Sequence, residues 1–296
     1  MPELPEVETV KRGLEPALLG RIFERIDLRR KDLRFPFPDG MAEIMRGAEV
    51  QALERRAKYI LVHCSNGKSL ILHLGMTGRF TILKPDGGSF EPGAFYHAAG
   101  GATEPGPHDH VIWHLDDGTR VIYNDARRFG FMDWADTHAR DDHKLLKDIG
   151  VEPLGNSFHL DHLIVKFRDK KAPMKAALLD QHVVAGLGNI YVSEALHRAR
   201  ISPKLMAGKL VKARGPDLRL AELVRHIRDI LNEAIAAGGS TLQDFQGTSG
   251  EKGAFQQRFL VYDREGENCV TPGCQSVIKR IVQSGRSTFY CPTCQR

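Results

Sequence analysis

The sequence lacks the features that mark membrane or secreted proteins. No apolar run in the 296 residues approaches the about 20 residues that a membrane-spanning helix needs. The first six residues, MPELPE, contain neither a basic segment nor an apolar one, so we expect no signal peptide. There is also no internal repeat and no low-complexity tail. We therefore expect a protein of the bacterial cytoplasm with no membrane partner.

Cysteine is scarce and unevenly distributed. Of the five cysteines, only Cys64 lies outside residues 269–294. The other four form a C-x4-C pair and, after sixteen intervening residues, a C-x2-C pair. Two such pairs supply the thiolates of one tetrahedral, structural zinc ion. The ligands would be Cys269, Cys274, Cys291 and Cys294. Cys64 follows an apolar run and is expected to be a small buried side chain.

Charge is only mildly asymmetric. The 42 lysines and arginines outnumber the 37 acidic residues, which gives a formal net charge of +5 and a pI near 8.9. This balance suits a polyanionic partner but does not identify one, because many basic enzymes bind no nucleic acid.

Hydrophobic spacing predicts a strand-rich first half. Residues 5–19 show helical spacing of apolar positions until Gly20 interrupts it. Short β-rich runs then follow at 59–64, 69–74, 79–83, 111–115 and 120–123, and they favour an antiparallel sandwich or barrel. The Gly-, Pro- and Ala-rich stretch 84–107 is expected to be a surface loop, and we assign it no role.

After about residue 136 the pattern becomes helical. Helical stretches at 174–184 and 189–200 flank a glycine-rich turn whose amides would suit a phosphate, although a purely structural turn has the same sequence. A long amphipathic helix from Leu220 is expected to end at Gly238 and Gly239. The glycines between residues 243 and 257 indicate a movable loop.

The N-terminus offers a nucleophile. Initiator methionine is usually removed before a residue as small as proline, which would leave Pro2 with a free secondary amine. An α-amino group has a pKa of about 8, against about 10.4 for lysine, so more of it is unprotonated at neutral pH. Its attack on a carbonyl-like carbon gives an iminium ion, and Glu3 is placed to donate a proton to a sugar ring oxygen. Many proteins, however, begin Met-Pro-Glu without any such chemistry.

Six motifs in order along the chain carry a resemblance to a known family. They are PELPEVE at 2–8, RRAKY at 55–59, HLGMTG at 73–78, DARRFG at 125–130, GLGNIY at 186–191 and the cysteine module. Together they resemble the formamidopyrimidine-DNA glycosylases, bacterial enzymes that remove oxidised purines.

The resemblance implies an α+β multidomain fold. It would comprise an N-terminal helix and antiparallel β-sandwich (1–135), a helical domain with a helix–two-turns–helix motif (136–264) and a zinc-finger ribbon (265–296). The implied activity is that of a bifunctional DNA glycosylase and AP lyase in base excision repair. Its substrate would be double-stranded DNA containing oxidised bases, and the enzyme would act as a monomer.

The resemblance also assigns catalytic roles. Pro2 would be the Schiff-base nucleophile at the deoxyribose C1′, and Glu3 the proton donor that assists ring opening. Lys58 would be the proton donor linked to β-elimination, and Arg286 the one linked to δ-elimination. Glu6 would support the active site. The charges of Arg55 and Arg56 beside Lys58 would favour a nearby phosphate or be a solvated strand edge.

A glycosylase must evert its base and fill the gap that is left. The residues implied for this are Met76, Arg127 and Phe129. Met and Phe are more often core residues, but glycine-flanked turns after strands favour exposure here. The other implied contacts to DNA are His73, His108, Lys171, Lys175 and Asn189. Either His108 or His110 could instead be a structural histidine.

The sequence departs from the family pattern in its first cysteine pair, which has four intervening residues where two are common. Zinc tolerates both spacings. Three other readings remain. An enzyme of the endonuclease VIII type typically has glycine where Leu4 stands. A non-catalytic DNA-binding protein would not need Pro2, Glu3 and Lys58. An RNA-modifying or ribosomal factor would be expected to show an aromatic stacking platform.

Overall fold

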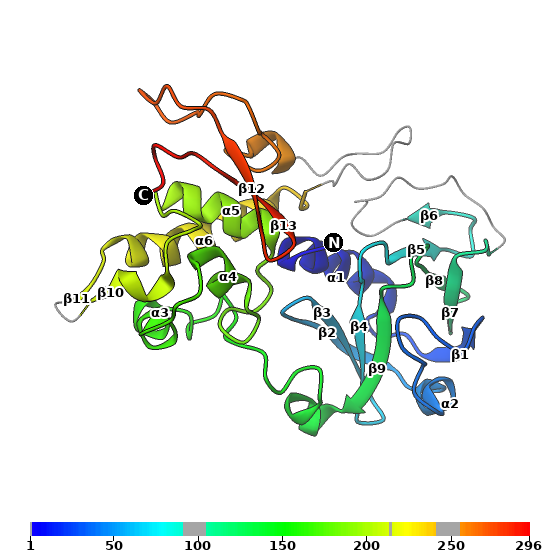
Figure 1. Ribbon diagram of the computed structural model, residues 1–296. Helices are drawn as coiled ribbons and strands as arrows, with labels where there is room; N and C mark the ends of the chain where they lie inside the picture. Colours follow the sequence, from blue (N-terminus) through cyan, green and yellow to red (C-terminus); the bar gives the residue numbers. More distant parts are fainter. Residues whose placement is uncertain (1, 91–104, 213–214, 241–254) are drawn as a thin grey trace. The chain divides into compact units, whose positions relative to one another are not determined.

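The computed structural model describes residues 2–90, 105–212, 215–240 and 255–296. The chain forms two compact units (Figure 1). The first contains Met1–Lys147 and Ala237–Ala254, and the second contains Asp148–Ala236 and Phe255–Arg296. The division into three domains at residues 135 and 264 stays a prediction.

The first unit is a two-layer β-sandwich with a helix packed on it. Its elements are α1 (Leu4–Leu18), β1 (Phe23–Leu28), α2 (Met41–Met45), β2 (Val50–Arg56), β3 (Tyr59–Cys64), β4 (Lys68–His73), β5 (Arg79–Leu83), β6 (Ser89–Phe90), β7 (Asp109–Leu115), β8 (Arg120–Asn124), β9 (Phe131–Asp136) and the 3-10 helix η1 (Thr137–Asp142). The antiparallel sheets have the orders β1-β7-β8-β5-β6 and β2-β3-β4-β9. One apolar core holds side chains from both sheets and from α1. The predicted fold class is confirmed.

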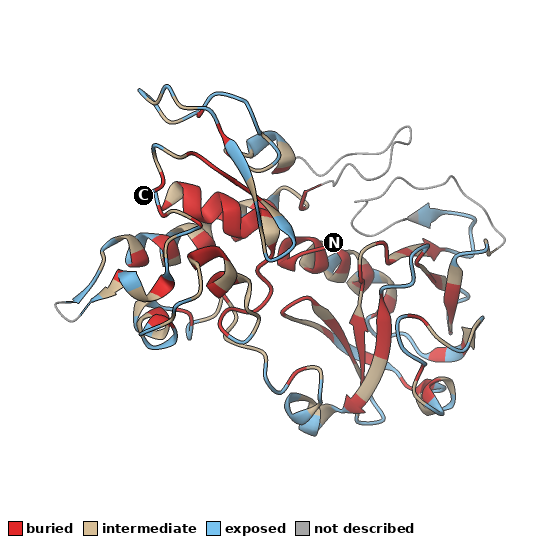
Figure 2. Cartoon of the chain, viewed as in Figure 1, coloured by how far each residue is buried: buried red, intermediate tan, exposed pale blue. Residues whose placement is uncertain are grey.

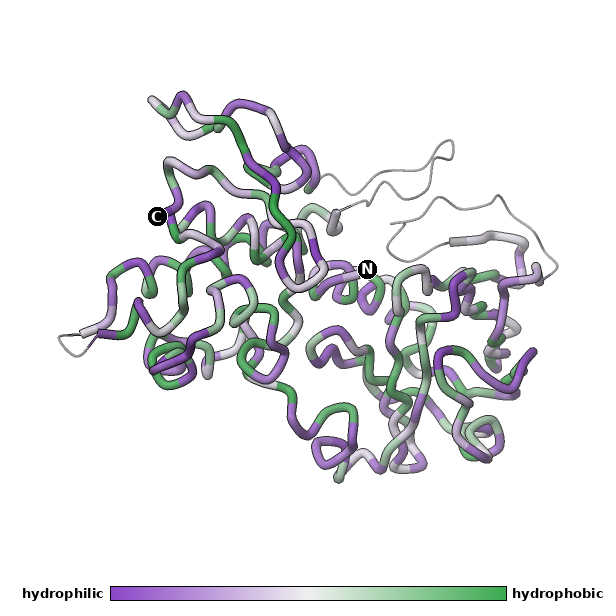
Figure 3. Tube along the Cα trace, in the orientation of Figure 1, coloured by the Kyte–Doolittle hydropathy of each residue, from purple (hydrophilic) through white to green (hydrophobic). Residues whose placement is uncertain are grey.

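Helix α1 begins at a capping box. The Glu3 carboxylate accepts from the backbone N–H of Glu6, and the Glu6 carboxylate accepts from the N–H of Glu3 at 2.9 Å. Pro5 in the first turn suits a position whose N–H has no helical partner. The apolar positions that predicted the helix are buried in the sandwich core, and hydropathy alternates along α1 accordingly (Figure 3).

Two connections cross between the sheets side by side. Strands β4 and β9 pair in one sheet, with His73 opposite Phe131, while β5 and β8 pair in the other, with Arg79 opposite Asn124. The turns 74–78 and 125–130, which join these strands, are therefore neighbours. A Cβ added to Gly75 would lie 2.2 Å from the Gly130 nitrogen, so the two turns touch through their backbones.

The second unit is a helical body with a β-hairpin. Its elements are α3 (Leu160–Phe167), α4 (Met174–Leu179), α5 (Asn189–Arg198), η2 (Ala207–Leu210), β10 (Val211–Lys212), β11 (Gly215–Pro216), α6 (Arg219–Ala236), η3 (Phe255–Arg258), β12 (Lys279–Gln283) and β13 (Arg286–Tyr290). Helix α5 packs on α4, α6 and β13 and is almost wholly buried (Figure 2).

Two predicted helices are shorter than expected. The stretch 174–184 is helical only to Leu179, because the Asp180 carboxylate accepts from the N–H of His182 and the Gln181 amide bonds to the backbone of Gly186 and Leu187 in the glycine turn. The stretch 189–200 ends at Arg198. Most of the loop 84–107 and of the glycine-containing segment 243–257 lies outside the described residues. No helix in the described part of the chain is long and apolar enough to cross a membrane.

Candidate functional site

Pro2 is buried immediately before α1, and the carboxylate of Glu6 organises the backbone around it. One Glu6 oxygen accepts from the Glu3 N–H, and the other accepts from the N–H and hydroxyl of Ser240 at 2.8 and 3.0 Å. Glu6 thus joins the start of the chain to a residue 234 positions away. The predicted supporting role of Glu6 has a geometric basis, whereas Ser240 carries no signal in the sequence.

Lys58 lies in the turn between β2 and β3 and is only 7% exposed. The preceding Ala57 has φ of 54°, and the Arg55 guanidinium donates to its carbonyl at 3.0 Å. Arg55 also forms an ion pair with Glu8 of α1 at 3.1 Å. Burial would raise the pKa of Glu8, but the hydrogen bond from Arg12 and the charge of Arg55 lower it. Arg55 therefore links α1 to the Lys58 turn and is not a solvated strand edge.

His73, at the end of β4, is neutral. Burial, followed by the charges of Lys58 and Arg34, lowers the pKa of His73 to about 4. Its ring stacks on Phe131 with centroids 4.9 Å apart, and its Nδ1 accepts from the Gly75 N–H at 3.0 Å. Nε2 therefore carries the hydrogen and is a neutral donor.

The two neighbouring histidines differ in exposure. His108 is exposed, whereas His110 is buried and its Nε2 bonds to the Asp125 carbonyl at 2.9 Å. Of the two alternatives that the sequence left open, His110 is thus the structural histidine.

The touching turns bring together the three side chains expected to fill the gap in DNA. Met76 is partly exposed, while Arg127 and Phe129 are exposed, as their glycine-flanked positions predicted. The Arg127 guanidinium lies over the Phe129 ring, 4.9 Å from its centroid. Beside them is a hollow of about 410 Å³ lined by Leu33, Arg34, Arg127, Arg128 and Phe129.

In the second unit, Arg286 is exposed at the tip of the β12–β13 hairpin. Ser284 and Gly285, with φ of 49° and 72°, form a two-residue turn of the kind that hairpins favour. Behind the tip, the Lys175 ammonium donates to the Ser287 carbonyl and the Thr288 hydroxyl, both at 2.7 Å. The Asn189 amide donates to the same carbonyl at 3.0 Å.

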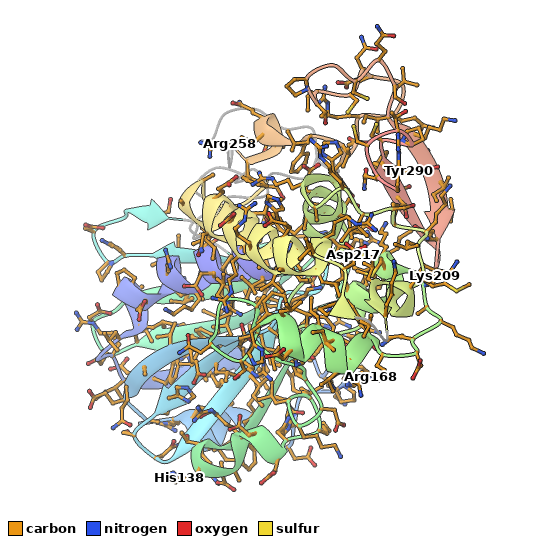
Figure 4. The ribbon with its side chains drawn as sticks, turned by 90° about the vertical axis from the view of Figure 1, so that its left-hand side faces the viewer. His138, Arg168, Lys209, Asp217, Arg258 and Tyr290 are labelled. Carbon is orange, nitrogen blue, oxygen red and sulfur yellow. The ribbon has the colours of Figure 1, made fainter. Side chains whose placement is uncertain are left out.

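The other cations of this unit are arranged differently. Lys171 is exposed, as are Arg168 and Lys209, whose side chains extend from the surface in Figure 4. Lys175 in contrast is 1% exposed and hydrogen-bonded within the protein.

The four clustered cysteines fit one zinc ion. Their sulfur atoms all lie within 4.8 Å of one another. The Cys269–Cys294 and Cys274–Cys291 sulfur distances are 3.8 and 3.7 Å. A tetrahedron with Zn–S bonds of about 2.3 Å has edges of about 3.8 Å, so the donor set has the size that zinc requires. With four protein ligands no position is open to substrate, and the metal is structural. Cys64 is buried elsewhere, and burial raises its pKa to about 12.

Glu194 is a further buried residue with a clear structural task. It lies on α5 at 1% exposure and accepts from the backbone N–H groups of Leu260, Val261 and Tyr262 at 2.7–2.9 Å. Burial raises its pKa despite these hydrogen bonds. It anchors the segment that precedes the zinc-binding cysteines to the helical body. Sequence reasoning missed this residue because nothing near Glu194 marks a distant loop as its partner.

Comparison with known families and proteins gives matches along the chain. The formamidopyrimidine-DNA glycosylase N-terminal domain matches residues 1–132, the H2TH domain of the same enzymes matches 149–246, and the zinc finger found in FPG and IleRS matches 266–296. The formamidopyrimidine-DNA glycosylase of Methylobacterium nodulans is 53% identical over 296 residues, which cover 100% of this chain and 99% of that protein.

Solved structures of FPG proteins are similar to this chain over its whole length. The MutM (FPG) protein of Thermus thermophilus has a TM-score of 0.80 at 35% identity, with 99% of this chain and 98% of that chain covered. A mutant Lactococcus lactis FPG in complex with DNA containing Fapy-dG has a TM-score of 0.84 at 31% identity, with full coverage of both chains.

A β-sandwich, a helical H2TH body and a four-cysteine zinc finger in one chain define a class of DNA-binding repair glycosylases. Within that class, the chain belongs to the formamidopyrimidine-DNA glycosylase family. It is an enzyme of base excision repair, a DNA glycosylase with AP lyase activity.

Proposed function

We propose that this enzyme excises oxidised purines, such as 8-oxoguanine and formamidopyrimidines, from duplex DNA through a Schiff base on Pro2 followed by β,δ-elimination. The observation that carries the proposal is the N-terminal arrangement. Pro2 precedes a helix whose capping box buries Glu3 and Glu6 next to it. A solved relative, the Lactococcus lactis FPG, binds DNA containing Fapy-dG, which supports the substrate class.

The first step needs the free amine of Pro2, so Met1 must be removed, because an amide nitrogen is not a nucleophile. The Pro2 lone pair forms a bond to C1′ as the bond from C1′ to the base breaks; the nitrogen then loses its proton to solvent, and the departing base takes one up. Glu3 gives a proton to the ring oxygen as the nitrogen lone pair opens the sugar. The product is an iminium ion, which withdraws electrons from C2′. A secondary amine has only one N–H, which it loses in forming this ion, so the ion cannot become a neutral imine by losing another proton.

The iminium ion then permits two eliminations. Loss of a C2′ proton breaks the bond to the 3′ oxygen, and a second elimination breaks the bond to the 5′ oxygen; water finally releases the sugar fragment from Pro2. We assign Lys58 as the proton donor linked to the first cleavage and Arg286 as the donor linked to the second. The burial of Lys58 and the exposed hairpin position of Arg286 suit a positioned donor and a phosphate-seeking group. Bound zinc supplies only the stability of that hairpin.

We assign the recognition of DNA to side chains of both units. Met76 and Phe129 are apolar wedges that would unstack base pairs, and Arg127 would pair with the orphaned cytosine. His73, His108, Lys171, Lys175 and Asn189 are assigned to the DNA backbone or the lesion-bearing strand. For Lys175 and Asn189, the bonds to Ser287 support an added role in holding the Arg286 hairpin.

The test is covalent trapping by borohydride on a duplex carrying 8-oxoguanine opposite cytosine. We expect a trapped complex when the chain starts at Pro2, and none when an N-terminal extension is left uncleaved before Pro2. Cleaving that extension should restore trapping in the same preparation, which makes the two forms a matched pair with equal zinc content. Trapping by the extended form at the rate of the cleaved one would overturn the Pro2 assignment.

The same duplex with thymine glycol in place of 8-oxoguanine tests which class of oxidised base the enzyme prefers. Faster excision of thymine glycol than of 8-oxoguanine would move the enzyme to the oxidised-pyrimidine type. Binding without nicking on either lesion would favour a non-catalytic DNA-binding protein. We further propose that the enzyme acts as a monomer in the bacterial cytoplasm, where its substrate DNA lies, and sedimentation at micromolar concentration tests the monomer.

A further inference from the structure

Beneath the partly exposed Met76 and the exposed Arg127 and Phe129 lies a buried carboxylate that no catalytic step uses. Asp125 is 0% exposed, so it does not reach DNA or solvent. One of its oxygens accepts from the Thr77 hydroxyl. The other accepts from the Gly130 N–H at 2.8 Å and from the Tyr123 hydroxyl at 3.4 Å. Burying a carboxylate is costly unless donors surround it, and here three donors from two turns and a strand do so.

The Thr77 hydroxyl makes a second hydrogen bond between the two turns. Its hydroxyl donates to Asp125 and accepts from the backbone N–H of Arg127 at 3.1 Å. The turn that carries Met76 is therefore bonded to the turn that carries Arg127 and Phe129 through one hydroxyl and one carboxylate. Burial and the nearby Asp125 charge raise the pKa of Tyr123 well above its ordinary value, so the phenol stays a donor.

Steric contact reinforces these bonds. Gly75 and Gly130 meet backbone to backbone, and a Cβ at Gly130 would lie 1.9 Å from the Tyr123 hydroxyl. Neither turn can shift without displacing the other or breaking a buried hydrogen bond. The burial of the side chains fits this arrangement. Thr77 and Asp125 point inward, while the side chains meant for DNA point outward.

We propose that Thr77 and Asp125 are positioning residues that lock the two turns into one rigid wedge. The wedge inserts Met76, Arg127 and Phe129 together, and it sets the preference for the base opposite the lesion. This inference rests on the proposed function in assigning those three side chains to the gap in DNA. The two residues act only where a base is everted, and the Pro2 chemistry itself does not need them.

The test compares Thr77→Val, which keeps the shape and removes the hydroxyl, with Thr77→Ser, which keeps the hydroxyl. Losing a buried hydrogen-bond donor and acceptor should slow single-turnover excision of 8-oxoguanine from a duplex by about 10- to 100-fold. Thr77→Ser should remain close to wild type. Cleavage of a single-stranded abasic oligonucleotide, which needs no eversion, should be unaffected in both. The preference for cytosine over adenine opposite the lesion should fall in Thr77→Val only.

A second readout does not depend on chemistry. A duplex with an uncleavable abasic analogue and 2-aminopurine beside it reports unstacking as fluorescence. At equal bound fraction, Thr77→Val and Asp125→Asn should lose most of the rise seen with wild type and Thr77→Ser. Melting temperature and zinc content establish that each variant is folded.

The outcomes separate the two proposals. Equal slowing of duplex excision and abasic cleavage, or no change in either, would overturn the wedge. An unchanged fluorescence rise in Thr77→Val would do the same. If wild type inserts into the analogue yet is never trapped by borohydride, the proposed chemistry fails while the wedge stands.

Discussion

The helix start and turns of the first unit and the Arg286 hairpin of the second unit are held by opposite hydrogen-bonding partners. In the first unit, buried carboxylates accept from backbone N–H groups: Glu6 from Glu3 and Ser240, and Asp125 from Gly130. In the second unit, the hairpin that carries Arg286 is held by donors, since Lys175 and Asn189 both bond to the Ser287 carbonyl.

Acceptors are used in one place and donors in the other because the backbone presents different groups there. The start of a helix and a tight turn present N–H groups that need acceptors. The inner side of the hairpin strand presents a carbonyl that needs donors. There is also an electrostatic consequence, because a buried ammonium adds to the positive potential at the Arg286 tip, while a buried acid would reduce it. The second unit also holds the four cysteines that fit a zinc ion, the one such cluster among the residues that the structure describes.

The largest effect should come from the metal. Cys291→Ser removes a zinc ligand that is 0% exposed. We expect it to abolish stoichiometric zinc binding and to lower the rate of duplex excision by at least about 100-fold. The reason is that structural zinc contributes about 10–16 kcal/mol to small zinc-dependent folds. Metal analysis and single-turnover kinetics measure both effects. Cys64→Ser, outside the cluster, is the matched control and should keep its zinc. Full excision by a zinc-free protein would show that the hairpin does not need its metal.

The buried acid of the first unit comes next. Glu6→Gln replaces a carboxylate that accepts three hydrogen bonds by an amide that can offer only one acceptor oxygen. We expect the free energy of unfolding to fall by about 3 kcal/mol, with slower trapping at Pro2. Denaturant unfolding and trapping rates test this. Ser240→Ala, which removes only the hydroxyl, should cost less than half as much; equal losses would mean that Ser240 dominates the contact.

These side chains show where sequence reasoning ends. The fold class, the exposure of Phe129 and the partial exposure of Met76 could be predicted, because strand periodicity and glycine-flanked turns are local signals. The Glu6–Ser240 contact could not, because no local pattern relates residues so far apart in the chain.

The inward turn of Arg55 was equally invisible. A basic residue beside Lys58 looks like a phosphate ligand until the packing of α1 on β2 brings Glu8 to it. The helix expected over 174–184 was too long for a related reason, since Asp180 and Gln181 bond to nearby backbone and compete with the helix.

The buried cation of the second unit should have a slightly smaller effect. Lys175→Met removes a donor to both Ser287 and Thr288 and should lower the free energy of unfolding by about 2 kcal/mol. With the hairpin less firmly held, products of β-elimination should accumulate relative to those of δ-elimination, as gel analysis of the DNA ends would reveal. Lys166→Met, at an exposed lysine of α3, is the control and should change neither quantity. An unchanged product ratio in Lys175→Met would separate the hairpin bonds from δ-elimination.

The smallest effect concerns His73, a histidine of the first unit whose pKa is lowered by burial and by the charges of Lys58 and Arg34. Its pKa of about 4 in the folded protein lies below the about 6.5 of an unfolded chain, so the unfolded state binds the proton more readily. The contribution of neutral His73 to the free energy of unfolding is therefore complete above about pH 6.5 and is lost as the pH falls toward 4. Between pH 7 and pH 5, wild type should lose up to about 2 kcal/mol more unfolding free energy than His73→Gln, whose side chain does not titrate. Parallel stability curves for the two proteins would mean that the pKa of His73 is the same in the folded protein as in the unfolded chain, and would contradict the lowered value.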